Sequence, residues 1–262
     1  MLKLVATDLD GTLLDARGEV STRTREVIAA LDERGVHVVF VTGRPLRWMD
    51  RLWEHVGDHG LAICSNGGIV YDARIHEVVA SRTIPVDTGL EVGRRLREGL
   101  PGTTYALERV DGFAKEPEFM PRLPPPPGMR LGPLEDIFDD RVVKLLARHE
   151  DHGPEEYWSR AEELVGSLVT TTWSAVGTLV EISAAEVTKA STLAQFCAER
   201  GIAADEVVAF GDMPNDVPML SWAGTSYAMA NGHALTKDAA AHIAPHHDED
   251  GVAQVLEELF PL

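Results

Sequence analysis

The chain has 262 residues, of which 44% are hydrophobic and 25% charged, as is usual for a globular protein with a sizeable buried core. Its formal net charge of −18 argues against binding nucleic acid by neutralising phosphates. No apolar run reaches the roughly 18 residues that span a bilayer, and Asp8 and Asp10 interrupt the apolar stretch at the N-terminus. Because Cys64 and Cys197 lie outside any CxxC pair, we expect reduced thiols in a cytoplasmic protein.

The first part of the chain alternates strand and helix patterns. Apolar, β-branched runs predict strands buried on both faces, at residues 2–7, 36–42 and 61–65. Helical spacing predicts helices at residues 21–34 and 45–56. Ser21 can cap the first of these helices, Gly35 can end it, and Pro45 suits the first turn of the second. Repeated strand–helix units predict a parallel sheet with helices on both faces.

The middle of the chain has a different pattern. Helices are predicted at residues 87–100 and 154–166, and strands at residues 103–107, 142–147, 168–173 and 178–182. Strands in succession beside two helices indicate an α+β domain, which we place at residues 83–183. The proline tract at residues 124–127 is typical of a stiff surface loop.

Strand–helix alternation returns after the insert. Helices are predicted at residues 189–200, 216–222 and 251–259, and strands at residues 207–211 and 225–229. The fold class is therefore α/β. A Rossmann-like core of residues 1–82 and 184–262 is interrupted by the α+β insert.

Two carboxylates follow the first predicted strand in Asp8-Leu9-Asp10-Gly11-Thr12-Leu13. Ligands of open parallel sheets bind beyond the carboxyl ends of the strands. The side chains of Asp8 and Asp10 repel each other unless a cation lies between them, and Gly11 permits a sharp turn. The alternative interpretation is an Asp-Gly turn with a solvated acidic rim.

Three further features lie at strand or helix ends. Thr42-Gly43-Arg44 offers a hydroxyl, an amide and a guanidinium, which together suit a phosphate. Lys189 begins a predicted helix, where the helix dipole disfavours a cation, so we expect an anion beside it. Gly211-Asp212-Met213-Pro214-Asn215-Asp216 places Asp212 at a strand end as a metal ligand, whereas Asp216 can also be read as a helix cap.

In this order, the four features resemble the four motifs of the haloacid dehalogenase superfamily of phosphotransferases. The hexapeptide beginning at Asp8 resembles motif one, Thr42 motif two, Lys189 motif three and residues 211–216 motif four. The α+β insert between motifs two and three is similar to the cap of subclass IIB, the Cof-type sugar-phosphate phosphatases. Ser65-Asn66-Gly67-Gly68 and the ending Asp248-Glu249-Asp250-Gly251-Val252-Ala253 also resemble that subclass.

The resemblance implies a Mg²⁺-dependent phosphatase that hydrolyses small phosphorylated metabolites through an aspartyl-phosphate on Asp8. Asp10 would act as general acid and then as general base. One Asp8 oxygen, the Asp10 backbone carbonyl and Asp212 would hold Mg²⁺. The residues expected to bind phosphate or substrate are Thr42, Gly43, Arg44, Asn66, Lys189 and Asn215, of which Thr42 and Lys189 complete the catalytic group with Asp8 and Asp10. The cap would close over the site and select the leaving group.

Two other functions fit the same motifs. A phosphomutase would use the same Asp8 and Asp10, and a non-catalytic sensor would bind phosphometabolites without turning them over. Hexose phosphates, pyridoxal phosphate, a flavin mononucleotide precursor and phosphoglycerate-type acids all remain open as ligands. We expect a monomer or small homo-oligomer without a nucleic-acid or membrane partner.

The histidines do not fit the resemblance. His149 and His152 have HxxH spacing, which is more typical of exposed loop histidines than of a metal-ligand pair. His246 and His247 stand where relatives often carry small polar residues, and the sequence gives no physical reason for that change.

Overall fold

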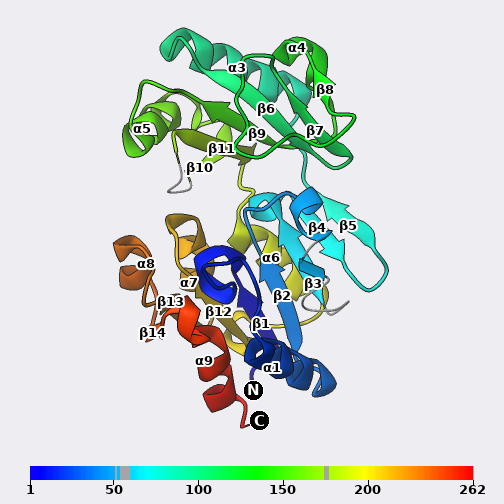
Figure 1. Cartoon of the computed structure of the whole chain (residues 1–262), viewed down its shortest axis with the longest axis vertical. Coiled ribbons are helices and arrows are strands. Elements are labelled where there is room, and N and C mark those ends of the chain that lie inside the picture. Colours follow the sequence, from blue (N-terminus) through cyan, green and yellow to red (C-terminus); the bar gives the residue numbers. More distant parts are fainter. Residues whose placement is uncertain (51, 54–59, 174–176, 262) are drawn as a thin grey trace. The chain divides into compact units, whose positions relative to one another are not determined.

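The computed structural model describes residues 1–50, 52–53, 60–173 and 177–261. The chain divides into two compact units, both drawn in Figure 1. The core unit comprises Met1–Ala80 and Thr188–Leu262, and the inserted unit comprises Ser81–Val187. The sequence analysis divided the chain at residues 82/83 and 183/184. Over the described ranges, every helix is too short or too polar to cross a membrane.

The core unit is built on an eight-stranded sheet with the order β14-β13-β12-β1-β2-β3-β4-β5. Its strands are β1 (Leu4–Thr7), β2 (His37–Val41), β3 (Leu61–Cys64), β4 (Ile69–Asp72), β5 (Glu77–Ser81), β12 (Val207–Gly211), β13 (Thr225–Met229) and β14 (His242–Ala244). Neighbours from β14 to β3 are parallel, and β4 is antiparallel to β3. The predicted parallel sheet is confirmed, with an antiparallel addition at one edge.

Helices cover both faces of this sheet, as predicted. The core helices are α1 (Thr22–Glu33), α6 (Lys189–Glu199), α7 (Val217–Trp222), α8 (Ala234–Ala239) and α9 (Gly251–Leu259). Apolar residues of α6 and α7 pack with Leu4 and Ala6 of β1 in one buried cluster. Val5 is also fully buried, and strand side chains alternate between faces, so it points to the opposite face, where α1 contacts β2 and α9.

Local sequence explains the ends of the first helix. The Ser21 hydroxyl accepts a hydrogen bond from the Thr24 backbone amide, so Ser21 caps the start of α1. Gly35 follows the helix with a φ of +74°, a conformation that glycine adopts without steric cost. Both signals were predicted from the sequence, and together they fix where the chain turns back into β2.

The order of the strands determines where the site forms. β1 lies between β12 and β2, and all three run in the same direction. Their carboxyl ends therefore meet at one edge, where Asp8, Asp212 and Thr42 follow β1, β12 and β2. The backbone amide of Asp8 donates to Phe210 O at 3.0 Å, so the pairing of β1 with β12 continues to the first residue of the site.

The inserted unit is an α+β domain with its own core. Its six-stranded sheet has the order β10-β11-β9-β6-β7-β8, and its strands are antiparallel except for the pair β7–β8. The strands are β6 (Thr104–Arg109), β7 (Gly112–Lys115), β8 (Arg130–Leu131), β9 (Val142–Arg148), β10 (Val169–Trp173) and β11 (Leu179–Ala184). The helices are α3 (Val86–Gly99), α4 (Leu134–Ile137) and α5 (Pro154–Val165). Tyr105 and Tyr157 are fully buried in the cluster that joins α3 and α5 to the sheet.

The sequence analysis missed several short elements, and one predicted helix begins differently in the structure. It did not predict β4, β5, β7, β8, β14, α4 or α8. β5 is mostly exposed and α4 has four residues, so neither gives a sustained apolar period. The helix predicted at residues 45–56 begins as a 3₁₀ turn, Leu46–Trp48, and much of its remainder lies outside the described residues.

Candidate active site

Lys189 joins two carboxylates at the centre of the site. Its Nζ donates to Asp8 Oδ1 at 2.8 Å and to Asp216 Oδ1 at 2.6 Å. All three side chains are buried, and Lys189 lies in the first turn of α6. The anion that the sequence predicted beside Lys189 is thus a pair of carboxylates from two other segments of the chain. This contact fixes the start of α6 against the end of β1.

Asp216 is a structural centre of the site and more than a helix cap. Its Oδ2 accepts hydrogen bonds from the backbone amides of Asp212 and Met213, at 3.0 and 3.1 Å. Since its Oδ1 is bonded to Lys189, both of its oxygens are engaged. Asp212 is held from the other side, because Thr12 Oγ1 donates to Asp212 Oδ1 at 3.2 Å. These bonds orient the Asp212 carboxylate toward the loop that follows β1.

The three buried carboxylates carry more negative charge than Lys189 can balance. Asp8, Asp212 and Asp216 place ligand oxygens within 4.8 Å of one another. Burial raises the pKa of Asp8 well above its usual value, and the charges of Asp216 and Asp212 add to this effect, against the opposing charge of Lys189. Burial, with the charge of Asp216, also raises the pKa of Asp212 to about 6. The site therefore favours protons or a cation.

Burial alone would lower the pKa of Lys189, but the outcome is the reverse. The carboxylates of Asp216 and Asp8 outweigh the loss of water around its ammonium group, so its pKa lies above the usual range. Lys189 therefore remains charged at neutral pH. A permanent positive charge within hydrogen-bond distance of Asp8 is suited to binding a phosphate oxygen.

Gly11 allows the loop after β1 to pass close to Asp212. Its φ is +74°, and a Cβ built on Gly11 would lie 2.3 Å from Asp212 Oδ2. Asn231, in the segment after β13, donates its Nδ2 to Gly11 O at 2.7 Å and so fixes this turn. Any larger side chain at residue 11 would push away the Asp212 carboxylate, which the turn now leaves accessible.

Asp10 is exposed, unlike the three buried carboxylates, and pairs with Arg44. Arg44 Nε donates to Asp10 Oδ2 at 2.7 Å and Arg44 Nη2 donates to Asp10 Oδ1 at 2.6 Å. The Asp10 side chain is 61% exposed. The sequence analysis gave these residues separate roles, acid–base catalysis and substrate contact, and did not anticipate the pairing. For either residue to act on a substrate, this ion pair must open.

Hydrogen bonds join the loops that follow β2, β3 and β12. The Thr42 hydroxyl accepts the Arg44 amide at 3.0 Å, and the Asn66 amide donates to Thr42 O at 3.0 Å. Asn215 Nδ2 donates to Asn66 Oδ1 at 3.3 Å. Asn215 Oδ1 is buried and has no hydrogen-bond partner among the described residues. The orphaned oxygen marks a place where a ligand or its water could donate a hydrogen bond.

All the predicted site residues lie in the core unit, and the structure adds further residues to the site. Asp8, Lys189 and Asp212 meet directly or through Asp216, whereas Asp10 lies at the exposed side with Arg44. Gly43 lies between Thr42 and Arg44 in the same loop. Sequence reasoning left Asp216 as a possible cap and did not select Thr12 or Asn231. The spacing of Asp216, four residues after Asp212, was the available signal, but Asn231 lies 220 residues from its partner.

A hard divalent cation fits the donors that the site presents. Carboxylate oxygens suit Mg²⁺, and Asp8 and Asp212 each have one oxygen, Oδ2, that accepts no hydrogen bond from the described residues. Asp216 is not a comparable ligand, since Lys189 and two amides already occupy its oxygens. The raised pKa values of Asp8 and Asp212 express the same need for positive charge.

Comparison with known proteins agrees with this arrangement. Residues 5–256 match the haloacid dehalogenase-like hydrolases. The chain belongs to this family. The prediction made from the four motifs, a phosphatase of the Cof type within this family, is confirmed, and its enzyme class is that of a phosphoric monoester hydrolase.

Relatives match along nearly the whole chain. The chain is 28% identical to the 5-amino-6-(5-phospho-D-ribitylamino)uracil phosphatase YcsE of Bacillus subtilis, covering 97% of this chain and 94% of that protein. It is 27% identical to the pyridoxal phosphate phosphatase YbhA of Escherichia coli, with 97% of each chain covered. The crystal structure of SMU.1108c from Streptococcus mutans has a TM-score of 0.85 at 22% identity and covers all of both chains, which shows the same fold.

Proposed function

We propose that the chain is a Mg²⁺-dependent phosphatase that cleaves small phosphorylated metabolites in two steps through an aspartyl-phosphate on Asp8. The observation that carries this proposal is the buried cluster in which Lys189 binds Asp8, the residue that follows β1, beside the end of β12. A fixed carboxylate with one oxygen turned away from its lysine partner is suited to act as a nucleophile.

In the first step, the Asp8 carboxylate attacks phosphorus and the ester P–O bond breaks. Lys189 binds a phosphate oxygen while remaining within reach of Asp8, and Thr42 donates its hydroxyl hydrogen to another. Asp10 gives its proton to the leaving alkoxide after it separates from Arg44. The products of this step are the free alcohol and phospho-Asp8.

In the second step, water attacks the phosphorus of phospho-Asp8. Asp10, now ionised, accepts a proton from this water, and the bond between phosphorus and Asp8 breaks. Inorganic phosphate leaves and the Asp8 carboxylate is restored. The same carboxyl group thus acts as acid and then as base, a contribution typically worth about 10²–10⁴-fold in rate.

Asp8, Asp212 and the backbone carbonyl of Asp10 are the groups that would hold Mg²⁺. When bound, the ion would offset the repulsion between an anionic nucleophile and an anionic phosphate. This matters for a chain with a net charge of −18, whose overall field repels its own substrate. The protein's contribution is to keep Asp8 and Asp212 close together and away from bulk water.

Arg44 and Asn66 are the residues that we assign to the part of the substrate near the phosphate, with the Gly43 amide and Asn215 beside them. The relatives named above act on a phosphoribitylamino-uracil and on pyridoxal phosphate, which supports a substrate of that size. We propose a phosphorylated sugar, sugar alcohol or vitamin-like metabolite as the substrate class.

Phosphate release from a panel of small esters tests the proposal. The panel contains hexose phosphates, pyridoxal phosphate, 5-amino-6-(5-phospho-D-ribitylamino)uracil and phosphoglycolate, each with Mg²⁺ and with EDTA. We expect release with Mg²⁺ that EDTA abolishes and that Asp8→Asn lacks. Isomer formation without phosphate release would replace the phosphatase by a mutase, and binding without turnover would favour a sensor.

A further inference from the structure

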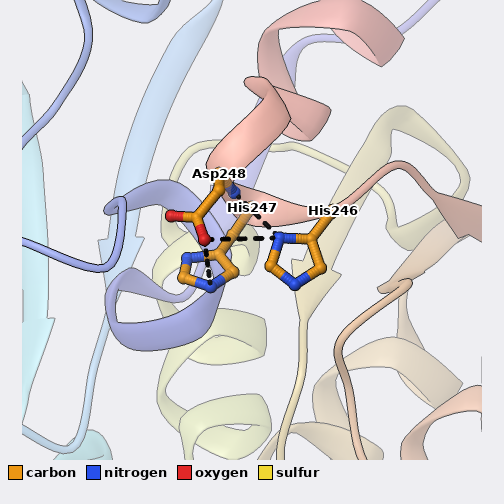
Figure 2. Close-up of side chains that lie close together, drawn as sticks. All are labelled: His246, His247 and Asp248. Carbon is orange, nitrogen blue, oxygen red and sulfur yellow. Dashed lines mark hydrogen bonds and ion pairs between the residues drawn. The ribbon is translucent and has the colours of Figure 1, made fainter.

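Two histidines and an aspartate converge at the turn between β14 and α9. His246, His247 and Asp248 offer one ligand atom each, and these atoms all lie within 4.8 Å of one another. Asp248 Oδ2 is 3.7 Å from His246 Nδ1 and 3.8 Å from His247 Nε2. Figure 2 shows both rings beside the Asp248 carboxylate. None of these side chains takes part in the mechanism proposed above.

The separations suit a metal ion better than direct hydrogen bonds. Hydrogen bonds from nitrogen to oxygen are commonly about 2.7–3.2 Å long, so neither imidazole is well bonded to Asp248 Oδ2. Three ligands placed tetrahedrally at about 2.1 Å from Zn²⁺ are about 3.4 Å apart. The observed spacing of 3.7 and 3.8 Å needs only small side-chain shifts to reach that geometry.

The ring of His247 is already oriented as in many metal sites. Its Nδ1 lies 2.7 Å from the backbone carbonyl of Leu14. A carbonyl can only accept a hydrogen bond, so a hydrogen is on Nδ1, and Nε2 is the nitrogen that the ring can offer to an ion beside Asp248. Metal-bound histidines commonly donate their second nitrogen to a carbonyl or carboxylate in this way.

The other two ligands are compatible with this arrangement. Asp248 Oδ1 accepts the Ala16 amide at 2.8 Å, which orients the carboxylate and leaves Oδ2 for an ion. His246 Nδ1 accepts the Asp248 amide at 3.2 Å, a long bond that coordination would replace. The side chains of His246 and Asp248 are 41% and 44% exposed, so an ion can enter from solvent and keep water as its remaining ligands.

The HxxH pair in the inserted unit provides a contrast. His149 Nε2 lies 2.9 Å from Pro101 O, and its Nδ1 accepts the Asp151 amide at 3.1 Å. Both nitrogens of this buried ring are occupied by the protein, so His149 has no lone pair to offer. His152 Nδ1 faces Glu156 at 3.2 Å. His149 is thus buried and bonded within the inserted unit, whereas the sequence analysis expected an exposed loop histidine.

We propose that His246, His247 and Asp248 bind one divalent transition-metal ion, with Zn²⁺ as the representative. Imidazole nitrogens favour Zn²⁺, Ni²⁺ and Cu²⁺, whereas the oxygen donors at Asp8 and Asp212 favour Mg²⁺. The two sites differ in chemistry, so millimolar Mg²⁺ leaves the histidine site available to Zn²⁺. This proposal does not depend on the phosphatase activity of the chain.

Calorimetric titration of the untagged full chain with Zn²⁺ tests the proposal. The buffer contains excess Mg²⁺ to fill the carboxylate site. The variants His246→Asn and His247→Asn remove the imidazoles, while the asparagine oxygen can still accept the Asp248 amide and the asparagine amide can still donate to Leu14 O. His242→Asn is the matched control, since His242 is an exposed histidine on the neighbouring strand.

We expect one Zn²⁺ per wild-type chain, with an affinity at least about tenfold weaker in each of the two variants and unchanged in His242→Asn. Equal binding by wild type and both variants would overturn the proposal, as would equal weakening in the control. Co²⁺ gives a second measurement on the wild type, because its visible spectrum separates a nitrogen-bound ion of low coordination number from an octahedral oxygen-bound ion. An octahedral spectrum alone would also overturn the proposal.

Thermal unfolding in EDTA shows that each variant is folded before its titration is interpreted. His246 is half exposed, so His246→Asn is the variant least able to disturb the fold. If His247→Asn unfolds, the comparison of wild type with His246→Asn still decides the outcome.

Discussion

Replacing Asp212 by asparagine should stabilise the metal-free protein at neutral pH and make it insensitive to Mg²⁺. Asp212 is 7% exposed and its pKa is raised from 3.8 to about 6, first by burial and then by the charge of Asp216. Its ionised form is thus disfavoured in the folded chain. Asparagine has nearly the same shape, carries no charge and can keep the hydrogen bond from Thr12.

The magnitude follows from the shift in pKa. Because the folded-state pKa of Asp212 lies above the unfolded value, the folded state binds the proton more tightly. Stability is then fully present below about pH 4 and is lost as the pH rises through about 6. A shift of about two units corresponds to roughly 3 kcal/mol. We expect the wild type in EDTA to fall behind Asp212→Asn by up to that amount at pH 8, and to equal it near pH 4.

Thermal unfolding of both proteins at pH 4.5 and pH 8, in EDTA and in Mg²⁺, measures this effect. A difference of roughly 3 kcal/mol amounts to several degrees in Tm for a chain of this size. Mg²⁺ should raise the Tm of the wild type more at pH 8 than at pH 4.5, because the ligand must be ionised, and should not raise that of Asp212→Asn. The reasoning is refuted if Asp212→Asn is the less stable protein in EDTA at pH 8.

Further substitutions separate the roles of the site residues. Asp8→Asn should abolish phosphate release while leaving the Tm in EDTA within a few degrees of the wild type; measurable release would refute Asp8 as the nucleophile. Asp10→Asn should lower kcat by about 10²–10⁴-fold and keep the Tm increase with Mg²⁺, since only acid–base help is lost, whereas the control Asp15→Asn, at a partly buried aspartate that pairs with Arg17, should leave kcat unchanged. Gly11→Ala should remove the Mg²⁺ response, because its Cβ would collide with Asp212 Oδ2; an unchanged response would show that the turn can move aside. Lys189→Met should destabilise the fold by about 3–5 kcal/mol in a urea titration, because two buried carboxylates lose their cation.

The central strands and the convergence of the four motifs were predictable for one physical reason. Strands buried on both faces must be apolar along their length, and residues 207–211 and 225–229 were assigned with the bounds that the structure has. Parallel strands then bring their carboxyl ends to one edge, so Asp8 and Asp212 could be expected to meet. Periodicity carries no such information for β14, which has three residues, two of them exposed.

The contacts between side chains could not be predicted in the same way. The pairing of Asp10 with Arg44 and of Asn66 with Asn215 depends on rotamers and on loops that are 34 and 149 residues apart in sequence. Asp216 was ambiguous because an aspartate at a helix start is usually explained by the helix alone. Its role became visible only when Lys189, 27 residues away, was found bonded to it.

The ion pair between Arg44 and Asp10 gives the proposed mechanism a natural order of events. The pair is bidentate, but the Asp10 side chain is 61% exposed, and ion pairs in such surroundings contribute only about 0–1 kcal/mol. An anionic substrate that attracts Arg44 can therefore open the pair at little cost. Asp10, released from its guanidinium partner, can then take up the proton that the leaving group needs. Substrate binding and release of the acid are coupled through this single contact, which holds the Asp10 carboxyl group against Arg44 until a phosphate ester draws the guanidinium away.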